Sequence, residues 1–550
     1  MKYILVIFSL LISFQIFCQP APQARMIAEW EPAIGTLIRW PLGIPSELVV
    51  ELAEDDSLYI LVENSTEEQQ ARAAFASWNV NMEHCSFIFA DTYSHWTRDW
   101  GPQCLFDGDG QIGILDPIFD GYPWVPATSR DWSEDDAVNA AFADQMNWNN
   151  YQLPAYLTGG NVMYDGYNSA FSSQQMLDEN LPILSNNEFF DLMQQYAGIE
   201  TYNIISNFEN LGIQHIDCIA KLLDEETVLI KEVDIWHPEY NMVEQVAAEF
   251  ENFTTCFDRP YNIIRIYCDY YLGNDVAAYT NSLILNKKVL VPLFGIASDD
   301  EAIATYEAAM PGYEIIGIPY SEWYYYDALH CRTMGIFDPD MIRIEHKPYI
   351  DTIISNQDYP IACKIVDYSQ QGLIDSELKL FWKTASQTEW NSILLQETAI
   401  DSFSANIPHQ PQGTEIQYYI SASSNSGKTA LHPIAASDDF HNFICQNSVQ
   451  SGNTLIESEF EMTVFPNPFN PSTTIEFSLT TEIMENTELE IYNLRGQKVK
   501  TLSVSPSQSL KASILWNGTD DNNQPVSSGV YFVKLQAGDF SVTKKCLLMK

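Results

Sequence analysis

Three short segments contain polar residues whose types suit group-transfer chemistry. The segment HWTRDWGP sets Arg98 beside Asp99 between two tryptophans, QHIDC carries His215 and Asp217 two residues apart, and ALHCRTMG carries Cys331. Each has an ordinary structural interpretation when taken alone: an ion pair in an aromatic turn, a polar strand end, and a small buried thiol in a loop. The His-x-Asp spacing also fits a metal-ligand pair, because residues two apart in a strand face the same side.

Together, the segments suggest one site. A cysteine, a histidine and two aspartates can supply a nucleophile, a general acid/base and two anionic anchors. Two carboxylates beside a thiol raise its pKa by repulsion, so such a site suits acyl transfer poorly unless a cation occupies it. A guanidinium is planar, positively charged and rich in N–H donors, and it pairs bidentately with carboxylates. The set therefore favours a guanidine substrate whose central carbon is held against the thiolate.

The region that must position these residues, from 19 to 345, alternates strand-like apolar runs with segments of helical period, which indicates an α/β or α+β fold. The clearest strand-like runs are Leu58–Val62, Thr227–Ile230 and Lys288–Leu293, and the clearest helical segments are Asp135–Met146 and Val243–Phe250.

Two further regions alternate apolar and polar residues with period two. Residues 346–447 do so around Leu380 and Tyr418, with Ser, Asn, Gly and Pro clusters between, which predicts a β-sandwich. A linker over 448–463 leads into a second small sandwich, 464–550, entered through FPNPFNPSTTIEFSL, whose prolines exclude a regular central strand. This last region, with its YNLRGQKV and SGVYF segments, resembles the FlgD-like Ig modules that serve as sorting signals for type IX secretion.

Composition and the N-terminus indicate export. The chain has 27 basic and 74 acidic residues, a net charge of −47, which excludes nucleic acid and anionic lipid as partners because phosphate binding needs clustered Lys and Arg. Residues 1–18 have a basic start and an apolar run that is too short to span a membrane, so they are predicted to be a signal peptide. No later run is long enough for a membrane span.

Ten cysteines are present, and nine remain once the signal peptide is removed. An odd number in an exported protein predicts at least one free thiol, for which Cys331 is the candidate. Cys363 and Cys445 flank the first β-sandwich region, and a bridge between them is one possible pairing.

Six ordered motifs carry a family resemblance over nearly all of residues 26–340. AEWEP, WTRDWGP, TGGN, HID, AYTNS and LHC occur in this order, and the set resembles the bacterial peptidylarginine deiminase and agmatine deiminase family of guanidino-group-modifying enzymes. The resemblance implies an α/β propeller (the pentein fold), five ββαβ-type units around a central site, followed here by two Ig-like β-sandwich domains.

The resemblance also implies residue roles. Cys331 is the nucleophile, His215 the general acid/base, Asp99 and Asp217 the guanidinium-binding carboxylates, and Asn281 the active-site asparagine of AYTNS. The expected reaction passes through a covalent thiouronium on the cysteine and needs neither metal nor cofactor.

Four more residues are assigned to substrate binding. Trp96 is expected to cover the apolar stem of arginine. Gly159 and Gly160 either let backbone approach the site closely or form an ordinary turn. Secreted relatives hold the carboxylate of a C-terminal arginine with arginines after the RD motif, and here that segment contains only Arg130.

The predicted substrate is an arginine residue in a peptide or protein, with agmatine or free arginine as alternatives. Three features favour a secreted or cell-surface enzyme that is exported across the inner membrane and onward by the type IX route. They are the signal peptide, the sorting-like tail, which would engage the secretion machinery, and Thr158, where agmatine-type relatives carry Glu. Two hypotheses of other classes remain: a non-catalytic surface protein that binds guanidino groups or acts in adhesion, and a thiol protease that uses Cys331 and His215.

Overall fold

The structure is a computed structural model, and it divides the chain into two compact units, residues 1–448 and 449–550. It describes residues 19–122, 131–209, 212–447, 462–467, 469–478, 487–493, 497–502, 511–522, 524–537 and 540–548. The predicted signal peptide, Arg130 and most of the predicted linker lie outside the described residues.

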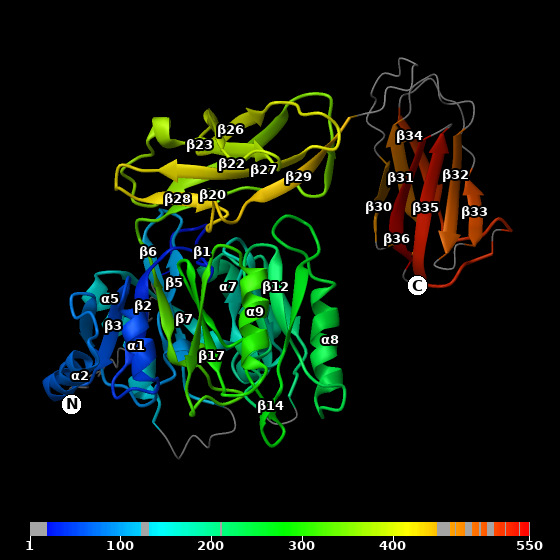
Figure 1. Cartoon of the computed structure of the whole chain (residues 1–550). Coiled ribbons are helices and arrows are strands. Elements are labelled where there is room, and N and C mark those ends of the chain that lie inside the picture. Colours follow the sequence, from blue (N-terminus) through cyan, green and yellow to red (C-terminus); the bar gives the residue numbers. More distant parts are fainter. Residues whose placement is uncertain are drawn as a thin grey trace, which may run out of the picture. The chain divides into compact units, whose positions relative to one another are not determined.

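Residues 19–345, which carry the predicted catalytic residues and are called the catalytic region below, contain five small sheets that share one strand pattern (Figure 1). In each, a first strand pairs antiparallel with a second, and the second pairs parallel with a third. The triplets are β5 (Gln103–Phe106), β6 (Ile112–Ile118), β7 (Asn149–Tyr156); β8 (Met163–Tyr164), β9 (Ser169–Ser173), β10 (Thr201–Ile205); β11 (Ala220–Leu222), β12 (Thr227–Glu232), β13 (Asn262–Tyr267); β16 (Leu283–Leu285), β17 (Lys288–Leu293), β18 (Glu314–Pro319); and β19 (Met334–Phe337), β2 (Ala33–Arg39), β3 (Ser57–Val62). The remaining strands are β1 (Arg25–Met26), β4 (Cys85–Phe89), β14 (Tyr270–Leu272) and β15 (Asp275–Val276).

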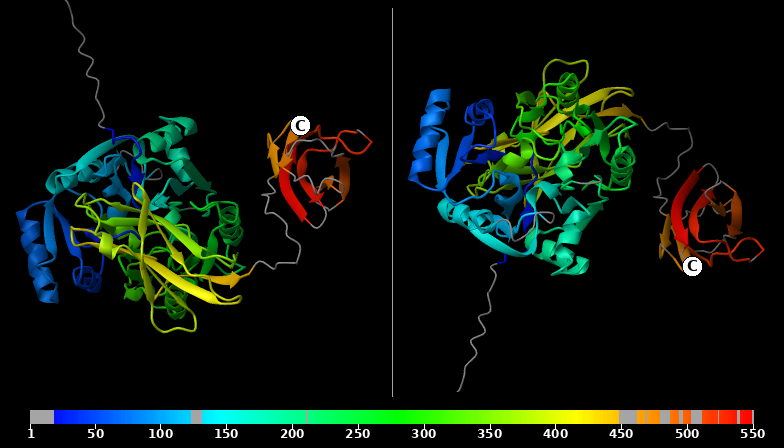
Figure 2. Two further views of the ribbon diagram at one scale, coloured as in Figure 1. Left: turned by 90° about the horizontal axis from the view of Figure 1, so that it is seen from above. Right: turned by 90° about the horizontal axis from the view of Figure 1, so that it is seen from below.

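Helices connect the parallel strands, as crossover connections require, and they lie at the periphery of the region (Figure 2). They are α1 (Ser46–Leu52), α2 (Ser65–Trp78), α4 (Ser133–Asp136), α5 (Val138–Met146), α6 (Gln175–Asn180), α7 (Asn186–Ala197), α8 (Tyr240–Phe250) and α9 (Asp299–Ala309). Helix α7 shows how sequence sets the ends: Ser185 and Glu188 form a capping box, and Gly198 stops the helix at φ +69°.

The last of these sheets joins the two ends of the region. Strand β19 pairs with β2, with Met334 opposite Leu37, so the segment that follows Cys331 is fastened to the segment that follows AEWEP. In the described part of the chain no strand pairing links one sheet to the next. The region therefore contains five separate sheets of the expected ββαβ type, and no closed propeller is formed by strand pairing within the described residues.

Residues 342–446 form two sheets. One contains β20 (Ile342–Glu345), β22 (Tyr359–Asp367), β26 (Ser402–Ile407) and β25 (Gln396–Ala399); the other contains β21 (Thr352–Ile354), β29 (His441–Gln446), β27 (Glu415–Ser423), β23 (Lys379–Thr384), β24 (Asn391–Leu394) and β28 (Thr429–His432). Both sheets contribute to one apolar core. Cys363 and Cys445 lie in different sheets of this module, and both are free buried thiols, so the suggested bridge is wrong.

This module packs against the catalytic region. Tyr368 stacks on Phe106 with ring centroids 3.6 Å apart, and its hydroxyl accepts a 2.7 Å hydrogen bond from Arg25 Nε. His432 Nε2 lies 3.3 Å from Glu225 Oε1. These contacts are within the first compact unit.

The second unit contains a three-stranded and a four-stranded sheet around a separate core. Its strands are β30 (Met462–Phe465), β31 (Thr473–Ser478) and β34 (Lys511–Trp516), and β33 (Lys498–Leu502), β32 (Thr487–Asn493), β35 (Gly529–Ala537) and β36 (Phe540–Leu548). No helix within the described residues is long and apolar enough to cross a membrane.

Candidate active site

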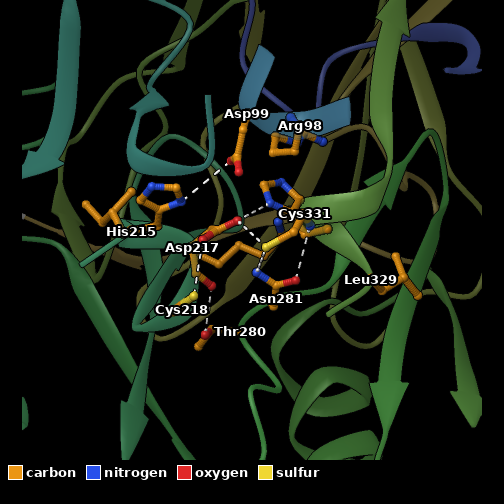
Figure 3. Close-up of polar contacts among 12 residues, drawn as sticks. Arg98, Asp99, His215, Asp217, Cys218, Thr280, Asn281, Leu329 and Cys331 are labelled. Carbon is orange, nitrogen blue, oxygen red and sulfur yellow. Dashed lines mark hydrogen bonds and ion pairs between the residues drawn. The ribbon is translucent and has the colours of Figure 1, made fainter. Parts of the chain in front are cut away.

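Every predicted site segment occupies the same position in its sheet. Asp99 lies in the short helix α3 (Thr97–Trp100) before β5, and Gly160 in the 3-10 turn η1 (Gly159–Asn161) before β8. Asp217, Asn281 and Cys331 lie directly before β11, β16 and β19. Because these motifs precede the first strands of five different sheets, their residues converge on one site. Asp99, Asp217, Asn281 and Cys331 are labelled in Figure 3.

Cys331 is held by Asn281. The Cys331 amide donates to Asn281 Oδ1, and Asn281 Nδ2 donates to the sulfur, each at 3.2 Å. The His330 amide donates to the Asn281 carbonyl at 3.1 Å. Cys331 lies in the 3-10 turn η3 (His330–Arg332) and is only 1% exposed, so both backbone and side chain of the thiol residue are fixed.

The carboxylates of the site keep this thiol protonated. The neighbouring Cys218 thiol lowers the pKa of Cys331, but burial and the charges of Asp217 and Asp99 raise it to about 11. Cys331 Sγ lies 3.7 Å from Asp217 Oδ2. A cation between the carboxylates would oppose this effect, because it stabilises the thiolate.

His215 and Asp99 face each other across the site. His215 Nδ1 and Asp99 Oδ1 are 3.5 Å apart, and both atoms are buried without a hydrogen-bond partner among the described residues. Burial lowers the pKa of His215 to about 4, which leaves the imidazole neutral at pH 7. Burial raises the pKa of Asp99 well above its ordinary value, although the Tyr122 hydroxyl donates to Asp99 Oδ2 and opposes the shift.

The two glycines provide close approach rather than an ordinary turn. A Cβ on Gly160 would lie 2.6 Å from Asp99 Oδ1, 3.0 Å from His215 Nδ1 and 3.2 Å from Asp217 Oδ2. A Cβ on Gly159 would lie 2.1 Å from the Arg98 carbonyl oxygen. A side chain at position 160 would therefore fill the space on which the three polar groups converge.

A further pair of residues was not identified from the sequence. His330 Nδ1 lies 2.8 Å from Asp217 Oδ2, and His330 Nε2 lies 2.6 Å from Glu29 Oε2. Burial alone would raise the pKa of Asp217, but its hydrogen bond and ion pair with His330 outweigh burial and lower it. Asp217 is therefore an ionised anchor. Glu29 lies in AEWEP and His330 in LHC, two of the motifs that carry the family resemblance. Membership of these motifs was the sequence signal that could have identified the two residues.

Two structural interpretations that the sequence left open for single motifs are not what the structure has. His215 and Asp217 are not in a strand: Ile216–Cys218 form the 3-10 turn η2, with His215 at its start. Its Ile216 amide donates to Asn161 Oδ1 at 3.2 Å, so TGGN supports HID directly.

Nor do Arg98 and Asp99 form an ion pair. Arg98 Nε instead donates to the Thr333 carbonyl at 3.2 Å, and its NH1 lies 3.9 Å from Glu29 Oε2. Trp96 is half-buried beside Tyr122, with ring centroids 5.4 Å apart in a T-shaped arrangement, so it is next to the residue whose hydroxyl contacts Asp99.

Chemically, the site combines a fixed thiol, a neutral imidazole and two carboxyl groups, of which Asp99 has a raised pKa and Asp217 a lowered one. In the part of the chain that the structure describes, no group of three His, Cys, Asp or Glu residues is arranged to hold a metal ion. The unpartnered oxygen and nitrogen at Asp99 and His215 are suited to a ligand that donates N–H groups.

Comparison with known proteins places the chain among deiminases. The sequence profile of the Porphyromonas-type peptidyl-arginine deiminase matches residues 25–336, and that of the secretion system C-terminal sorting domain matches residues 463–549. Proteins named "Putative agmatine deiminase" from Shewanella baltica (strain OS223) and Mycoplasma capricolum subsp. capricolum are each 24% identical, over 47% and 53% of this chain and 77% and 89% of theirs.

Solved structures agree on the fold. The agmatine deiminase of Enterococcus faecalis superposes with a TM-score of 0.50 at 18% identity, covering 57% of this chain and 96% of that one. The C-terminal sorting domain implies secretion or cell-surface localisation. Because the deiminase profile matches more than half of its residues, this chain belongs to the Porphyromonas-type peptidyl-arginine deiminase family.

Proposed function

We propose that this protein is a secreted peptidylarginine deiminase that hydrolyses the guanidinium of arginine residues to citrulline and ammonia. The observation that carries the proposal is the arrangement of unpartnered polar atoms around the thiol. In the part of the chain that the structure describes, Asp99 Oδ1 and His215 Nδ1 are buried without hydrogen-bond partners, and a Cβ at position 160 would fill the space beside them. A guanidinium supplies the N–H donors and positive charge that this space lacks.

Binding of the cation also activates the nucleophile. The raised pKa of Cys331, about 11, and the lowered pKa of His215, about 4, describe a neutral thiol and a neutral imidazole in the empty site. A guanidinium between Asp99 and Asp217 lowers the cost of a thiolate, because its charge offsets the two carboxylates. Cys331 then transfers its proton to His215.

The reaction follows in balanced steps. The thiolate attacks the guanidinium carbon, and His215, now protonated, gives its proton to the nitrogen that leaves as ammonia. The resulting thiouronium remains bound to Cys331. Neutral His215 next takes a proton from water, and the hydroxide adds to the same carbon. The thiolate departs, the hydroxyl proton of the adduct passes to solvent, and the proton on His215 returns to Cys331, so the ureido group of citrulline remains and the starting enzyme is restored.

Export supports arginine in extracellular proteins as the substrate. Residues 463–549 match a secretion sorting domain, and Thr158, buried before the two glycines, provides no charge for the amine of agmatine. Agmatine or free arginine is the second candidate, favoured by the names of the related proteins from Shewanella and Mycoplasma.

We also propose that the five sheets form the ring of the deiminase fold, and that residues 346–447 and 464–550 are Ig-like modules. The placement of every site motif before the first strand of a sheet supports the ring. Two sheets around one core in each C-terminal module support the second assignment.

The test is an ammonia and citrulline assay of the mature protein. Free arginine, agmatine, and peptides with internal or C-terminal arginine are the substrates, and Cys331→Ala is the control. We expect peptides to give the highest kcat/KM and the variant to release no ammonia above background. Binding of guanidines without turnover would instead support a non-catalytic surface protein. Peptide cleavage sensitive to iodoacetamide would support a thiol protease.

A further inference from the structure

His330 is placed between two carboxylates and makes a short contact with each. Nδ1 lies 2.8 Å from Asp217 Oδ2 and Nε2 lies 2.6 Å from Glu29 Oε2. A neutral imidazole has one N–H and one lone pair, so it can donate to only one of these oxygens. With both carboxylates ionised, only the doubly protonated ring satisfies both contacts.

The surroundings keep Glu29 ionised. Its Oε1 accepts from Lys221 Nζ at 2.7 Å and from the Ile284 amide at 2.9 Å, and Arg98 NH1 lies 3.9 Å from Oε2. Burial would raise the pKa of Glu29, but the charges of His330, Lys221 and Arg98 lower it well below its ordinary value. The charged groups around His330 are therefore Glu29 and Asp217 directly, and Lys221 and Arg98 behind Glu29.

We propose that His330 is a positioning residue: an imidazolium, held by Glu29 on one side, that fixes Asp217 as the ionised anchor for the guanidinium. The proposal rests on the proposed deiminase function. The Asp217 oxygen that His330 contacts also lies 3.7 Å from Cys331 Sγ, so the imidazolium both orients the anchor and offsets its repulsion of the thiolate. A small cavity of about 60 Å³ is lined by Glu29, Lys221, His330 and Asp217, so these charged groups share one space.

The test compares pH profiles of kcat/KM for full-length wild type, Glu29→Gln, His330→Gln and the double variant. Loss of the imidazolium raises the pKa of Asp217, so the acid limb moves to higher pH in both single variants, by about one unit or more. Because Glu29 acts through His330, the double variant moves no further than His330→Gln. KM for the guanidine rises more than kcat falls.

His237→Gln is the matched control, because the ring of this buried histidine hydrogen-bonds to the Asn274 carbonyl and the Glu239 amide. Its profile should match wild type. If Glu29→Gln and His330→Gln reduce melting temperature and activity while the acid limb stays in place, His330 is structural and the proposal is wrong.

A second measurement separates this proposal from the deiminase reaction. In ¹⁵N-histidine-labelled full-length protein at pH 7, the ring nitrogens of His330, assigned by their loss in His330→Gln, should both carry protons in wild type, and one of them should lose its proton in Glu29→Gln. A neutral ring in wild type at pH 7 overturns the proposal whether or not the protein turns over. Absence of turnover on every guanidine with a charged His330 overturns the proposed function alone.

Discussion

Asn281 contacts Cys331 at two atoms, accepting from its amide and donating to its sulfur at 3.2 Å in both cases. The asparagine therefore determines both the position of the thiol and one interaction that favours the thiolate. Replacing it with alanine removes both contacts.

We expect Asn281→Ala to reduce kcat by about 10²-fold, the cost typical of a misplaced reacting group. Steady-state citrulline formation measures the loss, and circular dichroism checks that the fold is kept. Activity within twofold of wild type in a folded variant would mean that the turn η3 positions Cys331 without Asn281.

Gly160→Ala should abolish activity without unfolding the protein. The added methyl would lie 2.6 Å from Asp99 Oδ1 and 3.0 Å from His215 Nδ1, in the space assigned to the guanidinium. Gly335→Ala is the matched control, since its methyl would meet nothing closer than 3.8 Å. Equal kcat/KM in the two variants would place the substrate elsewhere.

The two guanidinium carboxylates should differ in their effect on stability. The pKa of Asp99 is raised in the folded state. This carboxyl therefore reduces the free energy of unfolding as pH rises above the pKa that it has in the unfolded chain, about 3.9. The folded-state pKa of Asp217 is lowered, so it adds stability above that value and loses it as pH falls through the folded pKa.

At pH 7, Asp99→Asn should therefore be as stable as wild type or more so. Asp217→Asn should lower the free energy of unfolding by about 3 kcal/mol, because it removes the charged partner of the buried His330. Urea unfolding at pH 7 measures both, and both variants should be inactive. A larger loss for Asp99→Asn than for Asp217→Asn would contradict this assignment of charges.

Alkylation of the empty enzyme should follow the thiolate of Cys331. With a pKa of about 11, the reactive fraction rises about tenfold per pH unit between pH 7 and 10. Iodoacetamide labelling followed by mass spectrometry of the peptide containing Cys331 gives the rate, and Cys331→Ala removes the signal. A rate that does not change over this range would indicate a thiolate already formed without substrate.

The sequence predicted the residues of the candidate site better than the contacts that hold them in place. Cys331, Asp217 and Asn281 are polar residues in unusual settings, and the structure brings them together. The support from Glu29 to His330 joins residues about 300 positions apart, and local patterns do not reveal such a contact. The strand expected at His215 was wrong because hydrogen bonding to Asn161 stabilises a turn there instead.

The strands of the catalytic region were largely predictable, since runs such as Lys288–Leu293 are wholly apolar or nearly so, and the structure has a strand there. The arrangement into five sheets was not read from periodicity. A signal was present: the site motifs recur about every 50 to 64 residues at Asp99, Gly160, Asp217, Asn281 and Cys331, which is the spacing expected of repeated structural units.

The pairing of β19 with β2 has a consequence for the order in which the enzyme becomes active. Strand β19 is the last in chain order of the strands that build the five sheets. It begins three residues after Cys331 and pairs with β2, near the beginning of the region. A ribosome must therefore pass residue 337 before this strand pair can form. Until then the growing chain lacks the strand that fastens the η3 turn, which carries Cys331, so the candidate site is incomplete during most of the synthesis of this region.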